Sequence, residues 1–481
     1  MNKSISKNII IYAFKTLVGL LIPMISFPYI TRILSVDAIG KVSFSSSIIS
    51  YFILISGLGI YSYAVKEGAK IKDDEDAWNN FASEIFSLNI ITTLIAYIIF
   101  FILLLLSDKW SNYTYLLLII SINIFLTTIG VDWIYTIYEE YLYITIRTII
   151  VQIISIIFLF CFVKDDKDIY IYAVYTIFTS AGSNIFNFFY SKKYVKFRWK
   201  VTTNTLKYIK PILLLFFSSI ATHIYINSDI TILGYMTTDS EVGLYNVAVK
   251  VYNIAKMVLL SINTVTIARL AYLINNDSIE YKKLFNNLLN VNLIISIPSS
   301  IGLIVLSNQV LTVFSGIEYI KATSALSILA LSIPFSVLAS FIASGCLLLN
   351  NRENDILFAS VASAIINIVL NFILIPKCGI EAAAATTLIA EILAVCIHII
   401  NARKYSIIDF KIHNLLKLII SSLIMFLICT IMNKVINNIV LQIFGTALIG
   451  VIVYFTTMII LKYDVLLHYL NILHKKYIDR G

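Results

Sequence analysis

The chain has 481 residues, of which 59% are hydrophobic and only 13% are charged. Soluble domains carry about 25% charged residues, and one soluble core would not bury this much apolar surface. The composition therefore excludes a soluble globular protein and indicates that most of the chain lies in a lipid bilayer. The net charge of +9 does not imply a nucleic-acid partner, because no RNA- or DNA-binding pattern accompanies it.

Long apolar runs, separated by short gaps, follow one another along nearly the whole chain. Crossing about 30 Å of hydrocarbon takes about 20 mostly apolar residues, so each run predicts a transmembrane helix. We therefore expect an all-α, polytopic integral membrane protein with about fourteen spans. The predicted spans are 9–30, 42–62, 85–106, 114–137, 144–163, 170–190, 211–235, 242–270, 286–306, 323–349, 356–376, 380–401, 415–435 and 439–462.

The basic residues are distributed unevenly over the predicted loops. If the N-terminus is cytoplasmic, 25 of the 36 Lys and Arg lie in inner segments, 8 lie in outer loops and 3 lie within spans. Cytoplasmic loops collect Lys and Arg, so this distribution predicts that both termini are cytoplasmic. The densest basic loop, 191–210, agrees with this topology and with contact to anionic lipids.

A weak internal repeat divides the chain. Thr-Arg-Ile-Leu at 31–34 precedes Ile-Gly-Lys-Val-Ser-Phe at 39–44, and Thr-Ile-Leu-Gly at 231–234 precedes Val-Gly-Leu-Tyr-Asn-Val at 242–247. An even-numbered repeat gives parallel halves about an axis along the membrane normal. We expect an N-terminal lobe at 1–208 (spans 1–6), a C-terminal lobe at 209–403 (spans 7–12), and two extra spans with a cytoplasmic tail at 404–481.

The eighth predicted span carries the strongest polar pattern inside the membrane. Charged side chains there are costly and usually face a cavity. At 100° per residue, five polar residues fall in one sector of the helix. Two cations and three amides suit a cavity that binds anionic and hydrogen-bonding groups, although the lysines could instead snorkel to the interface and the amides bond other helices. These residues are Asn246, Lys250, Asn253, Lys256 and Asn263.

Other charges lie at similar depths in neighbouring spans. Asp229 and Lys250 differ in depth by only about 5 Å at 1.5 Å per residue, so an ion pair there would serve either as a gate or as charge neutralisation. Asp132 and Arg147 flank one inner loop, where a structural ion pair is expected. Lys15, in the first span, either faces the cavity or reaches the cytoplasmic interface.

Four further residues are candidates with weaker support. Arg32 and Arg269 lie near span ends, where an interfacial position is favoured and a phosphate contact is the alternative. Glu391 is in the middle of the twelfth span, and His398 lies seven residues later on the same face. This pair is a candidate for proton coupling, unless His398 is simply hydrated near the inner end.

Several chemistries lack their sequence signatures. The five Cys are scattered, and no Cys/His cluster indicates a metal site. No Gly-x-x-x-x-Gly-Lys-Ser/Thr sequence is present, so the chain is not expected to use ATP, and we expect no cofactor. The predicted outer loops are too short for an external catalytic domain, which argues against an enzyme such as a polysaccharide polymerase.

A set of short motifs resembles the Wzx-type polysaccharide flippases, which transport the repeat units of O-antigen and capsule. The likeness covers most of residues 1–400, and each motif alone is unspecific. One departure is Ser-Val-Asp at 35–37, where the family usually has a Gly-Pro-like turn. The motifs are Phe-Pro-Tyr-Ile-Thr-Arg-Ile-Leu at 27–34, Ile-Gly-Lys-Val at 39–42, Ile-Ile-Ser-Tyr-Phe at 48–52, Lys-Ile-Lys-Asp-Asp at 70–74, Asp-Trp at 132–133, Glu-Glu at 139–140, Ile-Thr-Ile-Arg at 144–147, Asp229 with Leu-Gly at 233–234, Gly-Leu-Tyr at 243–245, Ala-Arg-Leu at 268–270 and Tyr-Lys-Lys at 281–283.

The resemblance implies two six-helix lobes around a central cavity, within a superfamily that includes multidrug antiporters and lipid II flippases. It implies a non-enzymatic flippase in the bacterial inner membrane that moves undecaprenyl-diphosphate-linked oligosaccharides outward by alternating access, for O-antigen or other surface polysaccharide in lipopolysaccharide biosynthesis. Polymerase and chain-length proteins of the same pathway would be partners. The alternatives are a cation-coupled drug antiporter and, with less support, a membrane polysaccharide polymerase. The scarcity of deep acidic residues favours an anionic substrate over an organic cation.

Overall fold

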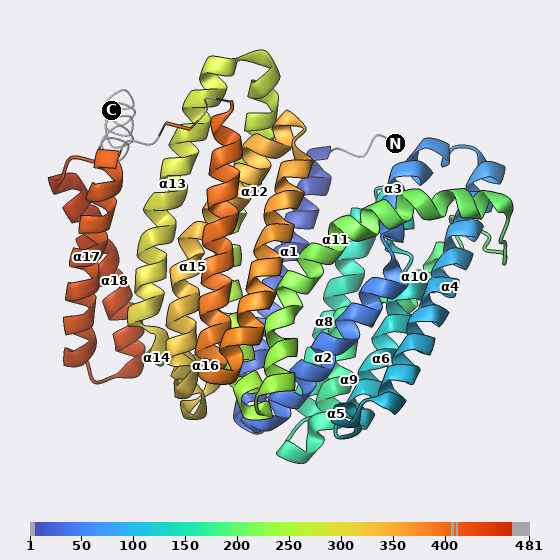
Figure 1. Ribbon diagram of the computed structural model, residues 1–481, viewed down its shortest axis with the longest axis horizontal. Helices are drawn as coiled ribbons and strands as arrows, with labels where there is room; N and C mark the ends of the chain where they lie inside the picture. The colour runs from blue at the N-terminus through green and yellow to red at the C-terminus, as the bar shows by residue number, and fades with distance from the viewer. Residues whose placement is uncertain (1–4, 406–407, 410–411, 464–481) are drawn as a thin grey trace. The chain divides into compact units, whose positions relative to one another are not determined.

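The computed structural model describes residues 5–405, 408–409 and 412–463, all of them helix or connecting segment (Figure 1). Within this range, some side chains of four helices fall outside the description. They are those of residues 5–17, 20, 203–204, 206, 218–219, 221–222, 225–226, 264–265 and 412. The chain divides into two compact units, Met1–Gly243 and Leu244–Gly481, and each is described separately below.

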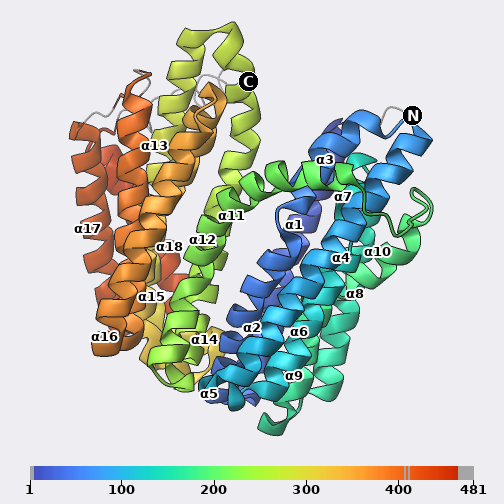
Figure 2. The ribbon, with the colours of Figure 1, turned by 45° about the vertical axis from the view of Figure 1, so that its right-hand side comes forward.

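The first unit is a bundle in which α2 packs against α4, α6 and α11, while α8 packs against α1 and α9 (Figure 2). Trp78, Phe81 and Ile134 are among the buried side chains that join α3, α4 and α7. The helices are α1 (Ile5–Ile33), α2 (Val36–Gly57), α3 (Ile60–Ile71), α4 (Glu75–Leu106), α5 (Asp108–Ser111), α6 (Thr114–Ile129), α7 (Asp132–Ile137), α8 (Tyr141–Phe162), the 3₁₀ turn η1 (Asp166–Asp168), α9 (Ile169–Ala181), α10 (Ser183–Ser191) and α11 (Thr203–Met236).

In the second unit, α15 packs against α13 and α16, and α17 and α18 pair with each other beside α13. Phe285 and Phe341, with ring centroids 4.9 Å apart, stack at the α13–α15 contact. The helices are α12 (Asp239–Asn276, whose first five residues belong to the first unit), α13 (Ser278–Val305), α14 (Ser307–Ser315), η2 (Ile317–Ala322), α15 (Thr323–Ile342), the π-helical turn η3 (Ala343–Leu347), η4 (Leu348–Asn350), α16 (Glu353–Arg403), α17 (Ile412–Val435) and α18 (Ile439–Ile460).

The predicted all-α membrane protein is confirmed. Ten helical stretches within the described residues are long and apolar enough to cross a membrane. One of them, α16, contains the predicted spans 356–376 and 380–401, which are joined at Gly379. Its φ of 51° and ψ of −129° lie where glycine is favoured. The predicted spans 9–30, 170–190 and 211–235 fall on α1, α9–α10 and α11, which is consistent with about fourteen spans.

Several helices begin well before the predicted membrane boundary. α4 starts at Glu75, ten positions before the predicted span, because Asp74 caps it by accepting hydrogen bonds from the backbone of Asp76 and Ala77. α13 is capped in the same way by Asp277. Such caps satisfy N–H groups that lack intrahelical partners, so the helix continues through polar sequence outside the hydrocarbon.

The basic segment after α10 is held along α4 in an extended conformation. The backbone N–H groups of Lys196, Arg198 and Lys200 donate to Asn79 Oδ1, Ser83 Oγ and Ser87 Oγ over 2.9, 3.2 and 3.0 Å. The three acceptors are spaced by four residues and therefore lie on one face of α4. The three donors are spaced by two residues, because alternate residues of an extended segment face the same side. The predicted basic loop is therefore an ordered strip on the first unit.

The packing of α11 bears on the expected lobes. Along the chain, α11 opens the predicted C-terminal lobe at 209–403, yet it packs against α2, α3 and α4 within the first unit. The lobes at 1–208 and 209–403, with the further segment at 404–481, stay predictions.

Candidate functional site

An ion pair in the second unit joins two charges that lie near the middle of their predicted spans. Lys256 on α12 and Glu391 on the second half of α16 approach to 3.0 Å between Nζ and Oε1. The lysine side chain is 23% exposed and the carboxylate 9% exposed. An unpaired charge inside a membrane segment costs much free energy. Each of the two residues lowers this cost for the other by neutralising its charge.

Aromatic and polar groups surround this pair. The Lys256 ammonium lies 5.4 Å from the centre of the Tyr252 ring, one turn earlier on α12, a geometry that stabilises a cation. His398, two turns beyond Glu391, places Nδ1 3.1 Å from the Ala339 carbonyl oxygen of α15. The structure thus pairs Glu391 with Lys256 and places His398 against α15. Their role in proton coupling stays a prediction.

The predicted polar stripe of α12 is only partly exposed. Asn246 and Asn263 are buried, Lys250 and Lys256 are half-buried, and Asn253 is exposed. Both amide atoms of Asn263 lack a hydrogen-bond partner among the described residues. A buried amide without partners is costly, so Asn263 marks a place where a polar ligand or water would be stabilised.

A buried hydrogen-bond cluster ties the two halves of α16 together. Thr386 Oγ1 donates to Asn371 Oδ1 over 2.5 Å, and Asn371 Nδ2 donates to Asn367 Oδ1 over 3.1 Å. All three side chains are fully buried. The cluster lies one turn before Glu391 along the second half, so it fixes the segment that carries the carboxylate.

We expect Thr386→Val to destabilise the protein by about 1–3 kcal/mol, because it removes the hydrogen bond of 2.5 Å to the buried Asn371 Oδ1 while keeping the side-chain volume. The free energy of unfolding in detergent measures this change. Thr456→Val is the matched control, because Thr456 is exposed and its hydroxyl bonds only carbonyls of its own helix. Equal effects of the two substitutions would contradict a structural role for the cluster.

In the first unit, the structure brings Asp132 and Arg147 together. Arg147 Nη2 lies 3.4 Å from Asp132 Oδ1, and Asn187 Nδ2 of α10 donates to the same oxygen over 2.6 Å. The hydroxyl of Tyr135 donates to the Asn187 carbonyl oxygen. Asp132 at the start of α7 therefore links Arg147 of α8 to Asn187 of α10. Its contact with the Asn187 side-chain amide is shorter than its contact with the Arg147 guanidinium.

The remaining predicted residues lie apart from these groups or outside the description. Asp229 is buried on α11, close enough to Tyr51 of α2 for an electrostatic interaction, and its predicted pairing with Lys250 stays a prediction. Arg32 is exposed and donates to the Pro28 carbonyl oxygen. Arg269 is exposed and pairs with Glu280 at 3.4 Å. The side chain of Lys15 lies outside the described residues.

Sequence reasoning singled out Lys256 and Glu391 but missed that they pair. Counted from the starts of their predicted spans, which run in the same direction, the two differ in depth by only about 5 Å at 1.5 Å per residue. That comparison would have indicated the pair. Asn187, Asn371 and Thr386 carried no comparable signal, because uncharged polar side chains are common in membrane helices.

Comparisons with known proteins agree with this architecture. Residues 5–273 match the family described as "Polysaccharide biosynthesis protein". A protein of Shigella dysenteriae named as an O-antigen transporter is 25% identical over 397 residues, which cover 81% of this chain and 98% of that one. A protein of Haloferax volcanii named as the low-salt glycan biosynthesis flippase Agl15 is 26% identical over 243 residues, so the match spans about half of each chain.

Solved structures show the same fold. The lipid II flippase MurJ in an inward closed conformation superimposes with a TM-score of 0.77 at 20% identity, covering 95% of this chain and 99% of MurJ. An inward-facing multidrug transporter of the MATE family gives a TM-score of 0.57 at 12% identity, covering 81% of this chain and 97% of that one. The family model matches more than half of the 481 residues, and the chain therefore belongs to the polysaccharide biosynthesis protein family.

Proposed function

We propose that the protein is a flippase that moves undecaprenyl-diphosphate-linked oligosaccharide repeat units from the cytoplasmic to the outer leaflet of a bacterial inner membrane. The observation that carries this proposal is the family match over residues 5–273. The relative named as an O-antigen transporter supports it over nearly its full length. No covalent bond changes in such a step, so the protein acts as a transporter and not as an enzyme.

The intramembrane charges favour an anionic substrate. Lys250 and Lys256 lie on α12 inside the membrane segment, and a diphosphate would be held by such cations through charge-assisted hydrogen bonds. The drug antiporter alternative rests on the likeness to MATE transporters, which concerns the fold alone.

The Lys256–Glu391 pair gives the proposed cycle a switch. Glu391 Oε1 lies 3.0 Å from the Lys256 ammonium and neutralises it. A diphosphate that reaches Lys256 would compete with Glu391 for the same N–H donors. Protonation of Glu391 would release the ammonium to the substrate, which is how a proton gradient would couple to transport in this proposal.

The topology and the partners complete the proposal. The excess of Lys and Arg in the predicted inner loops favours a cytoplasmic location for both termini. Polymerase and chain-length proteins would receive the repeat unit at the outer leaflet. The cycle uses alternating access and needs neither ATP nor a cofactor.

The first test asks where the lipid-linked repeat unit accumulates after deletion of the gene. A lectin or glycosidase that cannot cross the inner membrane reports the outer leaflet. We expect the repeat unit to be trapped at the cytoplasmic face and released by the wild-type protein but not by Lys256→Ala. Lys377→Ala, an exposed lysine at the turn of α16, is the matched control and should restore delivery.

Two outcomes would argue against the proposal. Unchanged delivery in the deletion strain, with no second flippase gene present, would exclude an essential flippase role. Repeat units that reach the outer leaflet but stay unpolymerised would favour the polymerase alternative.

A further inference from the structure

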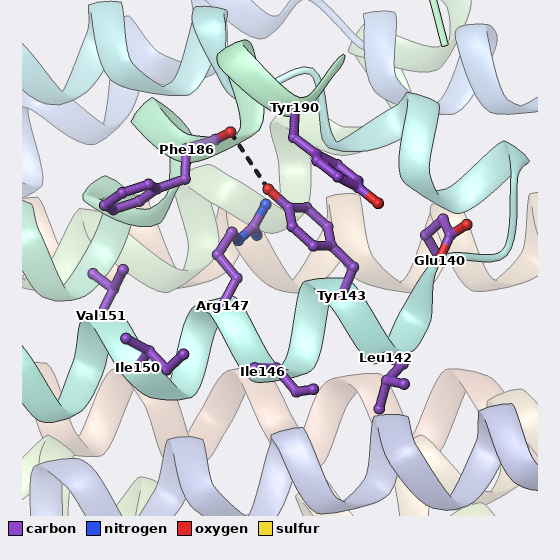
Figure 3. Close-up of a pocket in the computed structure, with 9 residues that line it drawn as sticks. All are labelled: Glu140, Leu142, Tyr143, Ile146, Arg147, Ile150, Val151, Phe186 and Tyr190. Carbon is purple, nitrogen blue, oxygen red and sulfur yellow. Dashed lines mark hydrogen bonds between the residues drawn. The ribbon is translucent and has the colours of Figure 1, made fainter. Parts of the chain in front are cut away.

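A pocket of about 510 Å³ lies in the first unit, between the first turns of α8 and the end of α10 (Figure 3). Neither Lys256 nor Glu391 of the proposed transport cycle lines it. Its lining combines one base, one acid, two tyrosines and an apolar wall. The lining residues are Glu140, Leu142, Tyr143, Ile146, Arg147, Ile150, Val151, Phe186 and Tyr190.

The base, Arg147, is incompletely satisfied. Its side chain is only 7% exposed, yet its contacts to Asp132 Oδ1 are long, at 3.5 and 3.4 Å from Nη1 and Nη2. Asn187 already occupies that oxygen at 2.6 Å, and Arg147 Nε has no hydrogen-bond partner among the described residues. A guanidinium carries five N–H donors, so this buried cation would gain from a phosphate oxygen.

The acid, Glu140, lies at the other end of the pocket. It is the N-cap of α8, seven positions before Arg147, which corresponds to about 10 Å along the helix axis. Its Oε1 accepts from the Tyr194 hydroxyl over 2.8 Å, and a carboxylate can accept further hydrogen bonds. The pocket therefore presents an anion beyond the helix start and a cation further along the helix.

Aromatic rings occupy the space between the two charges. Tyr143 and Tyr190 stack with ring centroids 4.0 Å apart. The Arg147 guanidinium lies 5.6 Å from the Tyr143 ring and the Lys193 ammonium 5.5 Å from the Tyr190 ring. Figure 3 shows this stack separating Arg147 from Glu140. The two charges are thus kept from neutralising each other directly.

The apolar wall continues along α8 and α10. Leu142, Ile146, Ile150 and Phe186 are each at least half exposed. Within a membrane segment, such side chains favour contact with hydrocarbon. Along α8 the acid precedes the base, and the exposed apolar side chains run beside both and continue beyond the base to Ile150.

We propose that this pocket binds a zwitterionic phospholipid with a primary ammonium headgroup, namely phosphatidylethanolamine. Its ammonium bonds Glu140, its phosphate bonds Arg147, and its acyl chains follow the apolar wall. The acid precedes the base along α8 as the ammonium lies outside the phosphate in the lipid, and the apolar side chains that continue beyond the base accommodate the acyl chains. The lining itself holds one acid and one base, which suits a zwitterion better than an anionic lipid or a diphosphate.

Native mass spectrometry of the purified full chain tests the proposal with lipids that share the same acyl chains. We expect phosphatidylethanolamine to bind about tenfold more tightly than phosphatidylcholine, because a quaternary ammonium cannot donate hydrogen bonds to Glu140. Mono- and dimethylated ethanolamine lipids should fall between them in order. Phosphatidylglycerol should also bind more weakly, because Glu140 repels it.

Glu140→Gln should reduce the preference for phosphatidylethanolamine over phosphatidylcholine severalfold and increase phosphatidylglycerol binding. Lys164→Gln, an exposed charge just beyond the other end of α8, should leave both preferences unchanged. The proposal is overturned if the wild-type protein binds all of these lipids alike, or if Glu140→Gln retains the wild-type preference. The comparison of lipids with increasingly methylated headgroups uses the wild-type protein. That test therefore holds even if Glu140→Gln fails to fold.

Discussion

Replacing Glu391 by Leu is expected to destabilise the protein by about 3 kcal/mol, because it leaves the largely buried Lys256 ammonium without its counter-ion. The two groups lie 3.0 Å apart, and the carboxylate is 9% exposed. Lys256→Met should cost a similar amount for the converse reason. The free energy of unfolding in detergent measures both.

The double variant Lys256→Met/Glu391→Leu separates stability from transport. Replacing both members of a buried pair with apolar residues of similar volume is often neutral or stabilising, so we expect most of the lost stability to return. The two effects should therefore be strongly non-additive. Additive losses would show that the 3.0 Å contact does not hold α12 to α16.

Delivery of the lipid-linked repeat unit gives the second readout. If Lys256 binds a diphosphate, the stable double variant should still fail to transport. The exchange Lys256→Glu/Glu391→Lys keeps a pair but moves the cation to α16, and it should also be inactive. Transport by the double variant would mean that the pair serves stability alone.

The all-α membrane architecture and the approximate positions of the long helices could be predicted from hydropathy, because each apolar run must bury about 20 residues in hydrocarbon. The helix ends could not. α4 begins at Glu75 and α12 begins at Asp239, since a capped helix continues into water and hydropathy reports only the part inside the membrane.

The charged site residues could be predicted individually, and so could the proximity of Asp132 to Arg147 across one loop, but the pairing of Lys256 with Glu391 was missed. Lys256 and Glu391 stand out because charges in apolar runs are rare. They are separated by 135 positions, and the fold brings them together at the contact between α12 and the second half of α16 that this ion pair makes. The expected link of Glu391 with His398 followed from spacing on one helix, which shows a shared face but not a contact.

The glycine pair at the starts of α2 and α12 was noticed in the sequence as part of a repeat, and the structure gives it a physical role. A Cβ atom on Gly40 would overlap the Asp239 carbonyl oxygen, and one on Gly243 would overlap the Val36 carbonyl oxygen. Val36 and Asp239 are the first residues of their helices. Each helix start therefore contacts the glycine four positions into the other helix.

Gly40→Ala should consequently destabilise the protein by about 2 kcal/mol or more, since a backbone carbonyl cannot move aside as a side chain can. Gly243→Ala should behave alike. The double variant should cost less than the sum, because both methyl groups force the same two helix starts apart. Thermal unfolding in detergent, followed for all three variants, measures these effects.

Gly57→Ala, on the same helix α2, is the matched control. A Cβ atom there meets nothing within 4 Å, and alanine is favoured over glycine within a helix by about 0.5–1 kcal/mol, so this variant should be neutral or slightly more stable. The contrast isolates the close approach of the two backbones from the general cost of changing a glycine. Equal stability of Gly40→Ala and Gly57→Ala would mean that the two helix starts are not in contact at these glycines.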